Sequence, residues 1–298
     1  MRYAGELAAL GTAACFASSS NLFASAGRRM GSHILNRLRI PTAWAFLTLA
    51  LWFVHRAWWP TWATPAALVA LSASGIVGLV FGDSWAFRSI VILGPGRASL
   101  LAATTPLFTT ALAWPFLHQR PEPLAYVGIL LNFGGVAFAL TAHSRRQAAH
   151  AEGSQAIGVA AGLLGALGQA GGMILSKVGL RTGLDPLSAT VIRIAAAAVT
   201  IWLMTAAQRQ VRPTLAVLRD PQAAGFMAAG AILGPFLGVT LALTSLYFIE
   251  AGVSASIIAI SPLIAMLIAA RFHGEHLTWR ALVGAAIAIT GVVILFRR

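Results

Sequence analysis

The chain has 298 residues, of which 58% are hydrophobic and 10% charged, and its mean hydropathy is +0.79. Soluble domains are about half apolar and carry about 25% charged residues, so this composition excludes a soluble globular protein and indicates a polytopic membrane protein. The net charge of +13 comes almost entirely from arginines, which we expect at the ends of membrane spans and against lipid head groups rather than on a nucleic-acid surface. The single cysteine, Cys15, excludes a disulfide framework and a cysteine-built metal site.

Ten apolar segments long enough to cross a bilayer follow one another along the chain. The first begins close to Met1 without a small-residue cleavage site, so we expect no cleavable signal peptide. The one notable polar connection divides the chain into a first five-helix unit, residues 1–142, a linker, residues 143–155, and a second five-helix unit, residues 156–298. The predicted spans are 6–26, 34–54, 64–87, 97–116 and 122–141, then 157–177, 187–207, 222–246, 252–271 and 278–296.

The two units are copies of each other at a constant offset of 156 positions. Because each copy has five spans, an odd number, the second copy enters the membrane from the opposite side. The sequence therefore predicts an all-α fold with ten transmembrane helices in two inverted five-helix repeats, which is typical of secondary transporters with a substrate site near the midplane. The matched landmarks are Gly78 with Gly234, Gly82 with Gly238, Gly96 with Gly252, Pro106 with Pro262, Gly128 with Gly284 and Gly135 with Gly291.

The basic residues bear on the orientation of the chain in the membrane. If both termini are cytoplasmic, the loops and helix ends on the far side hold more arginines than those on the cytoplasmic side, so the positive-inside rule favours termini outside. Several of these arginines lie within helix ends, where they need not act as topology signals. The sequence leaves both orientations open.

Two prolines and a row of glycines predict features of helix packing. Pro106 and Pro262 lie near the centres of the fourth and ninth segments, and each frees the carbonyl four residues earlier. A freed carbonyl in hydrocarbon needs a protein or water partner, so each proline marks either a structural kink or a hinge that lines a cavity. Glycines at helical spacing between Gly158 and Gly172 predict a closely packed face on the sixth segment.

An ionisable residue inside a span is a functional candidate by default. Asp83 lies toward the end of the third segment, where it could pair with Arg88 or Arg97, or bind a proton for coupling. We favour structural pairing, because a carboxylate beside an arginine usually stays charged. Arg37 and Arg193 are repeat equivalents about one turn into their helices, and they are further candidates unless their side chains reach the interface.

Uncharged polar and aromatic residues deep in the spans are the candidate substrate contacts. Hydroxyls, amides and aromatic rings suit a neutral, zwitterionic or weakly polar solute, whereas a polyanion would call for buried arginine or lysine. Phe81 and Trp85 share a helix face and would stack on a solute if that face meets the cavity, or fill space if it meets lipid. The predicted contacts are Ser19, Asn21, Phe81, Trp85, Thr105, Gln169, Thr240 and Ser261, with Pro106 and Pro262 as hinges and Asp83 as the candidate coupling residue.

Enzymatic chemistry finds little support. The string His273-Gly274-Glu275-His276 lies in a short turn and lacks the His-Glu-x-x-His spacing that places two ligands on one helix face. The chain has no Gly-x-Ser-x-Gly motif and no phosphate-binding glycine loop. We therefore expect no catalytic residue, no cofactor and no metal. With no signalling domain attached, a membrane sensor or scaffold is an equally weak hypothesis.

Several motifs resemble the drug/metabolite transporter superfamily, and within it the EamA-like ten-helix transporters, which include YddG-type amino-acid exporters. The motifs are Gly82-Asp83-Ser84-Trp85-Ala86-Phe87, Gly94-Pro95-Gly96-Arg97-Ala98-Ser99, Thr105-Pro106-Leu107, Ser261-Pro262-Leu263 and Gly274-Glu275. The resemblance implies a cavity between the halves, alternating access, and termini in the cytoplasm. The first repeat departs from the pattern, because His118-Gln119 stands where the second repeat has Gly274-Glu275.

Taken together, the residues and the resemblance predict an inner-membrane transporter that exports small metabolites. We expect amino acids as the substrates, neutral and aromatic ones among them. The expected partners are a small-molecule substrate and the lipid bilayer, without nucleic acid, and the protein would act as a monomer, with a homodimer as the alternative. The second hypothesis is a proton-coupled multidrug or toxic-cation efflux pump, in which Asp83 would take part in coupling.

Overall fold

The computed structural model describes residues 3–144, 155–273 and 279–297, and this part of the chain is helical without a strand. Ten helical spans in it are long and apolar enough to cross a membrane, so the predicted all-α, ten-span fold is confirmed. Most of the predicted linker, residues 143–155, lies outside the described residues. The spans are Ala4–Met30, Ile34–His55, Pro65–Leu93, Arg97–Leu117 and Pro123–Leu140, then Gln155–Leu180, Pro186–Ala207, Pro221–Phe248, Ala251–Ile268 and Trp279–Phe296.

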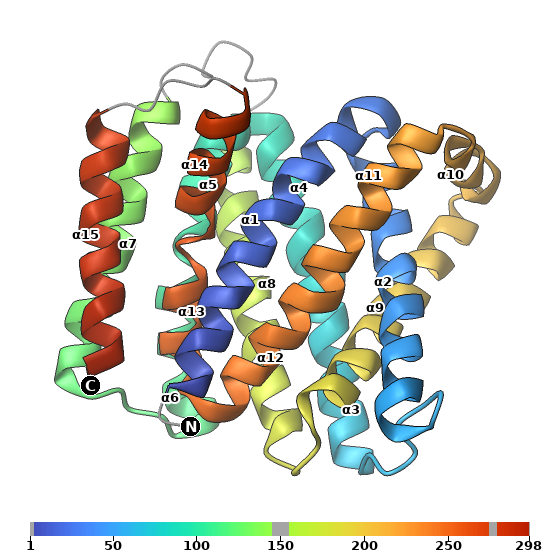
Figure 1. The fold of residues 1–298 in the computed structure, drawn as a ribbon, viewed down its shortest axis with the longest axis horizontal. Coiled ribbons are helices and arrows are strands. Elements are labelled where there is room, and N and C mark those ends of the chain that lie inside the picture. The colour runs from blue at the N-terminus through green and yellow to red at the C-terminus, as the bar shows by residue number, and fades with distance from the viewer. Residues whose placement is uncertain (1–2, 145–154, 274–278, 298) are drawn as a thin grey trace.

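The helices follow the same order in both halves, except that the second half has an additional short helix and 3₁₀ turn between its second and third spans (Figure 1). The first half contains α1 (Ala4–Met30), α2 (Ser32–His55), α3 (Pro65–Ser74), a π-helical segment (Gly75–Gly82), α4 (Asp83–Leu93), α5 (Pro95–Ala102), α6 (Thr105–Leu117) and α7 (Pro123–Ser144). The second half contains α8 (Gln155–Leu180), α9 (Pro186–Ala207), α10 (Val211–Ala216) with a 3₁₀ turn (Val217–Arg219), α11 (Pro221–Ala231), a π-helical segment (Ile232–Gly238), α12 (Val239–Phe248), α13 (Ala251–Ile258), α14 (Ser261–His273) and α15 (Trp279–Arg297).

Four spans are interrupted, and the interruptions recur at matched places in the two repeats. The third and eighth spans each contain a π-helical segment that ends at a glycine, Gly82 or Gly238. The fourth span breaks between Ala102 and Thr105, and the ninth breaks 156 positions later, between Ile258 and Ser261. The residue after each break is followed by proline, which has no backbone N–H to continue the hydrogen-bond ladder.

The inverted relation of the repeats is visible where α7 packs on α15. A Cβ at Gly135 would lie 2.6 Å from the carbonyl oxygen of Gly284, and a Cβ at Gly284 would lie 2.5 Å from that of Gly135. Gly128 and Gly291 meet in the same reciprocal way. An early residue of one helix thus faces a late residue of the other, so the helices are antiparallel. The repeat equivalents of the two glycines in one contact form the other contact, so a two-fold axis relates the two contacts. Side chains at these four positions would force the backbones apart.

The predicted small-residue face of α8 is confirmed as a packing face. A Cβ at Gly168 would lie 2.8 Å from the Cα of Gly82, and a Cβ at Gly172 would lie 2.8 Å from the Cα of Gly78. The glycines of α8 therefore meet glycines of the π-helical segment, and the two backbones come close enough for side chains beside them to reach across.

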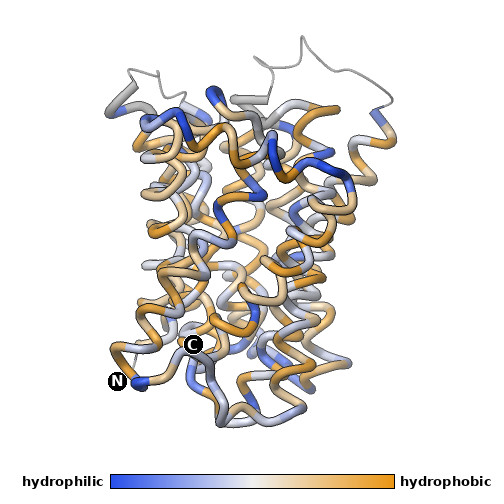
Figure 2. The backbone as a smooth tube through the Cα atoms, turned by 90° about the vertical axis from the view of Figure 1, so that its right-hand side faces the viewer, coloured by the Kyte–Doolittle hydropathy of each residue, from blue (hydrophilic) through white to orange (hydrophobic). Residues whose placement is uncertain are grey.

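The two ends of the molecule differ in polarity. Both chain termini lie at the same end, as an even number of spans requires (Figure 1). Hydrophilic residues gather at the opposite end (Figure 2). The polarity of this end agrees with the sequence, in which the loops and helix ends on the side away from the termini hold more arginines.

The α7–α15 contact yields a prediction with an internal control. Gly135→Ala places a methyl group against the Gly284 carbonyl and should destabilise the protein by about 1 to 3 kcal/mol, the usual effect of overpacking. Gly134→Ala, at the adjacent position, meets nothing within 4 Å and should leave the protein unchanged. The check is the melting temperature of both purified variants in detergent, and equal melting temperatures would contradict this packing.

Candidate functional site

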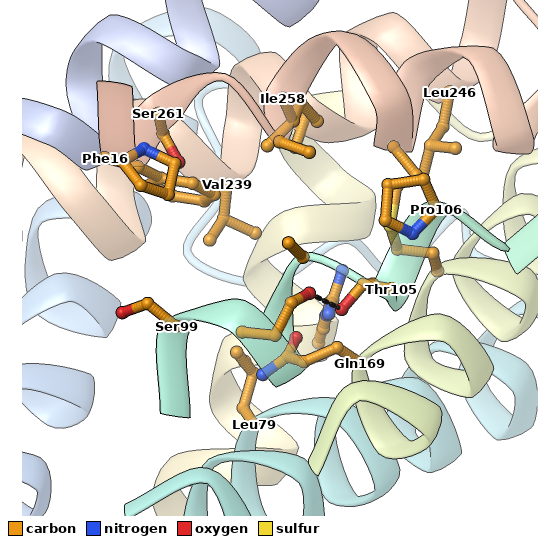
Figure 3. Close-up of a pocket in the computed structure, with 18 residues that line it drawn as sticks. Phe16, Leu79, Ser99, Thr105, Pro106, Gln169, Val239, Leu246, Ile258 and Ser261 are labelled. Atoms are coloured by element: carbon orange, nitrogen blue, oxygen red, sulfur yellow. Dashed lines mark hydrogen bonds between the residues drawn. The ribbon is translucent and has the colours of Figure 1, made fainter. Parts of the chain in front are cut away.

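A cavity of about 250 Å³ lies between the two repeats, at the level where the fourth and ninth spans break. The labelled side chains in Figure 3 surround it, with Thr105 and Gln169 on one side and Ile258 and Ser261 across from them. Most of the wall is apolar, and its largest apolar side chains are Phe16, Leu79, Met173, Val239, Leu246 and Ile258.

Equivalent residues of the two repeats form the part of the wall that contains the breaks. The pairs, each separated by 156 positions, are Ser99 with Ala255, Ala102 with Ile258, Ala103 with Ala259, Thr105 with Ser261, and Pro106 with Pro262. The cavity therefore forms where irregular backbone from both repeats comes together, which is the kind of place where membrane proteins tolerate such backbone.

The two breaks satisfy their backbone groups differently. In the first repeat the Thr105 hydroxyl donates to the carbonyl of Ala102 at 2.7 Å, the bond drawn as a dashed line in Figure 3. The neighbouring Thr104 hydroxyl donates to the carbonyl of Leu101 at 2.6 Å. In the second repeat the structure gives the Ser261 hydroxyl no hydrogen-bond partner among the described residues. Ser261 is thus, like Ser99, a hydroxyl in the wall without a hydrogen-bond partner among the described residues, and is available to a solute.

The structure brings together three of the eight predicted contact residues. Thr105, Gln169 and Ser261 all line the cavity, and both predicted hinge residues, Pro106 and Pro262, lie in its wall. Their contact with a solute stays a prediction, as does the hinge motion.

The other five predicted contacts lie outside this wall. Asn21 and Thr240 donate to carbonyls of their own helices, and Ser19 does the same while packing against Gly234. Phe81 is 44% exposed, and its ring meets that of Trp85 edge to face at 6.0 Å. On the same helices as Ser19 and Thr240, Phe16 and Val239 take the places in the wall.

Asp83 belongs to a buried polar network next to the cavity. One carboxylate oxygen is ion-paired with Arg39 of α2, and the other accepts a hydrogen bond of 2.6 Å from the side-chain amide of Gln169. The same Gln169 nitrogen donates to the carbonyl of Gly78 at 3.1 Å. Gln169 therefore connects the wall of the cavity to the ion pair.

The predicted partners of Asp83, Arg88 and Arg97, are wrong. Arg88 lies over the ring of Trp85, 5.4 Å from its centroid, and the ion pair forms instead with Arg39. Arg39 is 44 residues away in the sequence and reaches Asp83 from another helix. The prediction relied on the arginines that follow Asp83 closely in the sequence. The ion pair forms with Arg39 because α2 packs beside Asp83.

Arg193 is the functional candidate that sequence reasoning placed wrongly. We placed it about one turn into its helix, close enough to reach the interface, but it lies two turns inside α9, is 4% exposed and lines the cavity. Its Nη1 donates to the hydroxyl of Ser176 at 3.0 Å, and Ser176 in turn bonds the hydroxyl of Ser74 at 2.7 Å. Its buried Nε has no hydrogen-bond partner. The available signal was the long apolar run on both sides of Arg193.

Its repeat equivalent, Arg37, has a different environment. Arg37 donates to Gln208 at 2.8 Å and to Thr214 at 3.4 Å, both residues of the second repeat near the membrane surface end of α9 and in α10. The two repeats therefore carry arginine at equivalent positions, but of the two only Arg193 lines the cavity.

On the side of the cavity toward the chain termini, hydrogen bonds connect the ends of α6, α8 and α12. Lys177, one turn beyond the cavity residue Met173, uses its buried ammonium group for two carbonyls. The bonds are Lys177 to Leu246 O and to Ile249 O (2.9 Å), Arg181 to Leu117 O (2.6 Å), and the Ala251 N–H to Gln119 Oε1 (3.1 Å).

The described residues contain no group of three or more His, Cys, Asp or Glu side chains that could hold a metal ion. Most of the His273-Gly274-Glu275-His276 string lies outside the described residues.

A family model, that of the EamA-like transporter family, matches residues 3–141 and again residues 156–297. The chain belongs to this family. The two matches correspond to the two repeats, and membership makes the protein a multi-pass membrane transporter of small molecules. A search of curated proteins finds no significant match. A chain from a solved structure described only as "Crystal structure of protein" shares the fold with a TM-score of 0.76 at 15% identity, over 99% of this EamA-like chain and 96% of that one.

The Gln169 contacts predict the effect of removing its amide. Gln169→Leu leaves a buried Asp83 oxygen and the Gly78 carbonyl without their donor, and should reduce solute counterflow in proteoliposomes about tenfold, at unchanged expression. Gln222→Leu, at the exposed start of α11, is the matched control and should transport normally. Unchanged counterflow by the Gln169 variant would remove this residue from the site.

Proposed function

We propose that this EamA-like protein exports small metabolites, above all amino acids of neutral or aromatic type, across the inner membrane by alternating access. The observation that supports the proposal is the cavity at the two helix breaks, which has mostly apolar walls and a few polar groups. Pockets that bind small molecules combine these features, because apolar walls supply affinity and a few polar groups fix the orientation of the solute.

The size of the cavity favours a small solute. Typical sites for drug-sized ligands measure roughly 300 to 1,000 Å³, whereas this cavity measures about 250 Å³. The polar groups in its wall include the hydroxyls of Ser99, Thr105 and Ser261 and the amide of Gln169. Such a lining suits an amino acid with an apolar or aromatic side chain better than a large amphipathic drug.

The arrangement of the breaks supports alternating access. In this mechanism the two repeats would rock around the cavity, with the chain bending at Pro106 and Pro262. The hydrogen bonds around Lys177 would then hold one side closed, and they would break when the opposite side closes. The protein would work as a monomer, because the cavity lies within one chain.

The alternative, a proton-coupled efflux pump for drugs or toxic cations, has less support. It needs a carboxylate that can bind a proton or meet a cation in the cavity. Asp83 is the described carboxylate in the middle of a span, and its two oxygens are engaged by Arg39 and Gln169. Arg193 in the wall would also repel a cation.

Counterflow tests the proposed function directly. Proteoliposomes are loaded in turn with single amino acids or with a lipophilic cation, and uptake of the labelled solute is followed with and without a pH gradient. We expect saturable amino-acid flux that ignores the gradient and no flux of the cation. Cation flux driven by the proton gradient would establish the efflux pump instead, and flux of neither would contradict the substrate class.

Neutralising Asp83 separates a structural role from a coupling role. Asp83→Asn breaks a buried ion pair and should destabilise the protein by roughly 3 kcal/mol, because Arg39 is left without its carboxylate. Amino-acid flux should fall with the amount of folded protein, and its independence of the pH gradient should persist. Loss of gradient-driven cation flux at unchanged stability would identify Asp83 as a coupling residue.

The control for this variant is Asp220→Asn. Asp220 is exposed, and hydrogen bonding from the backbone N–H of Ala223 lowers the pKa of its carboxyl group. It accepts this bond and one from Gln222 as the cap of α11, and asparagine can do the same. The melting temperature of Asp220→Asn should therefore stay close to that of the unmodified protein.

A further inference from the structure

The charges in the centre of the molecule do not balance. Two arginines lie inside spans, Arg193 buried and Arg39 partly buried, and Asp83 is the carboxylate near them. The other described carboxylates lie at helix ends or in loops: Glu6, Glu122, Asp185, Asp220 and Glu250. Asp83 is ion-paired with Arg39, which leaves one positive charge, that of Arg193, without a paired carboxylate among the described residues.

Two other cations inside spans have their charge met by the protein. Lys177 donates to two backbone carbonyls, and Glu250 lies close enough to attract it. Arg39 has Asp83, and its guanidinium also lies over the rings of Phe23 and Phe87. Arg193 has the hydroxyl of Ser176 and the longer-range attraction of Asp83. Its charge is therefore the one that the protein compensates least.

The hydrogen-bonding capacity of Arg193 is also largely unused. A guanidinium group has five N–H donors, and the structure gives Arg193 one hydrogen bond, from Nη1 to Ser176. Nε is buried without an acceptor. A buried donor without an acceptor is costly, and an uncompensated charge in a low-dielectric interior costs more. The cost of the charge falls when an anionic acceptor enters the cavity beside Arg193.

We propose that Arg193 binds the carboxylate group of the transported solute and makes this cavity selective for monocarboxylates, amino acids included. The proposal rests on the proposed transport of a small metabolite and specifies its chemical class. Guanidinium and carboxylate groups form strong, charge-assisted hydrogen bonds with each other. The single excess charge matches one carboxylate, and the hydroxyl of Ser261 and the apolar wall remain for the rest of the solute.

The experiment compares solutes that differ in the carboxylate alone. The pairs are L-leucine with L-leucinamide, L-phenylalanine with L-phenylalaninamide, and benzoate with benzamide. For each we measure the concentration that gives half-maximal thermal stabilisation of the purified protein and half-maximal counterflow inhibition. The unmodified protein should prefer the acid of a pair by about ten- to a hundredfold, the range expected for a hydrogen-bonded charge.

Two substitutions of Arg193 test its role. In Arg193→Gln the half-maximal concentrations of the acid and the amide should lie within about twofold of each other, because glutamine keeps a donor but removes the charge. Arg193→Lys should retain a preference for the acid with weaker binding, since the charge remains without the planar fork. Arg37→Gln is the matched control at the equivalent position of the other repeat, and should keep the full preference.

The outcomes separate this inference from the proposed substrate. If Arg193→Gln loses the preference for amino acids over their amides, the result supports both the carboxylate site and the amino-acid substrate. If amino acids have no effect but benzoate does, and Arg193→Gln abolishes it, the carboxylate site stands and the amino-acid substrate falls. A preference that survives in Arg193→Gln, or an unmodified protein that binds no acid better than its amide, overturns the inference. If Arg193→Gln does not fold, equal weakening of acid and amide by Arg193→Lys overturns it.

Discussion

The structure depends on one constraint, which is that a backbone inside a membrane must find hydrogen-bond partners within the protein. Uninterrupted helices meet it by themselves, so irregular backbone can occur only where protein or a cavity surrounds it. The two proline-containing breaks obey this rule. They lie together between the repeats, and at the first break the hydroxyl of Thr105 covers the carbonyl that Pro106 helps to free. The cavity and the irregular backbone are thus two consequences of the same constraint.

Close backbone contact is the second requirement, and glycine provides it. A Cβ at Gly78 would lie 2.9 Å from Nη2 of Arg193, and a Cβ at Gly82 would lie 3.1 Å from the backbone nitrogen of Gln169. The absence of side chains at these two positions lets α8 and α9 approach the π-helical segment. That approach brings Gln169 to Asp83 and to the Gly78 carbonyl. The glycines that looked like a packing feature in the sequence therefore also position the polar groups of the site.

The features that the sequence predicted well are those that depend on position along a helix. Span lengths, the repeat offset and the two prolines are of this kind, and the prolines do lie in the cavity wall. Rotation about a helix axis is a different matter, because it is decided by contacts between helices. Thr240 was predicted to face the solute, but its hydroxyl bonds a carbonyl of its own span, and the neighbouring Val239 lies in the wall. The Arg39–Asp83 pair escaped prediction for the same reason, since it joins two helices.

The two repeats share a backbone plan but not a set of charges. Breaks and π-helical segments recur at equivalent places, so each repeat carries the same irregular backbone. Asp83, by contrast, is matched by Val239, and the arginines Arg37 and Arg193 are matched in type but not in burial. Motion that exchanges the two sides of a membrane needs equivalent bending points in both halves. Binding one solute in one orientation needs the opposite, a wall whose polar groups are not repeated. A sequence that conserves glycines and prolines between its copies while varying their charges meets both needs.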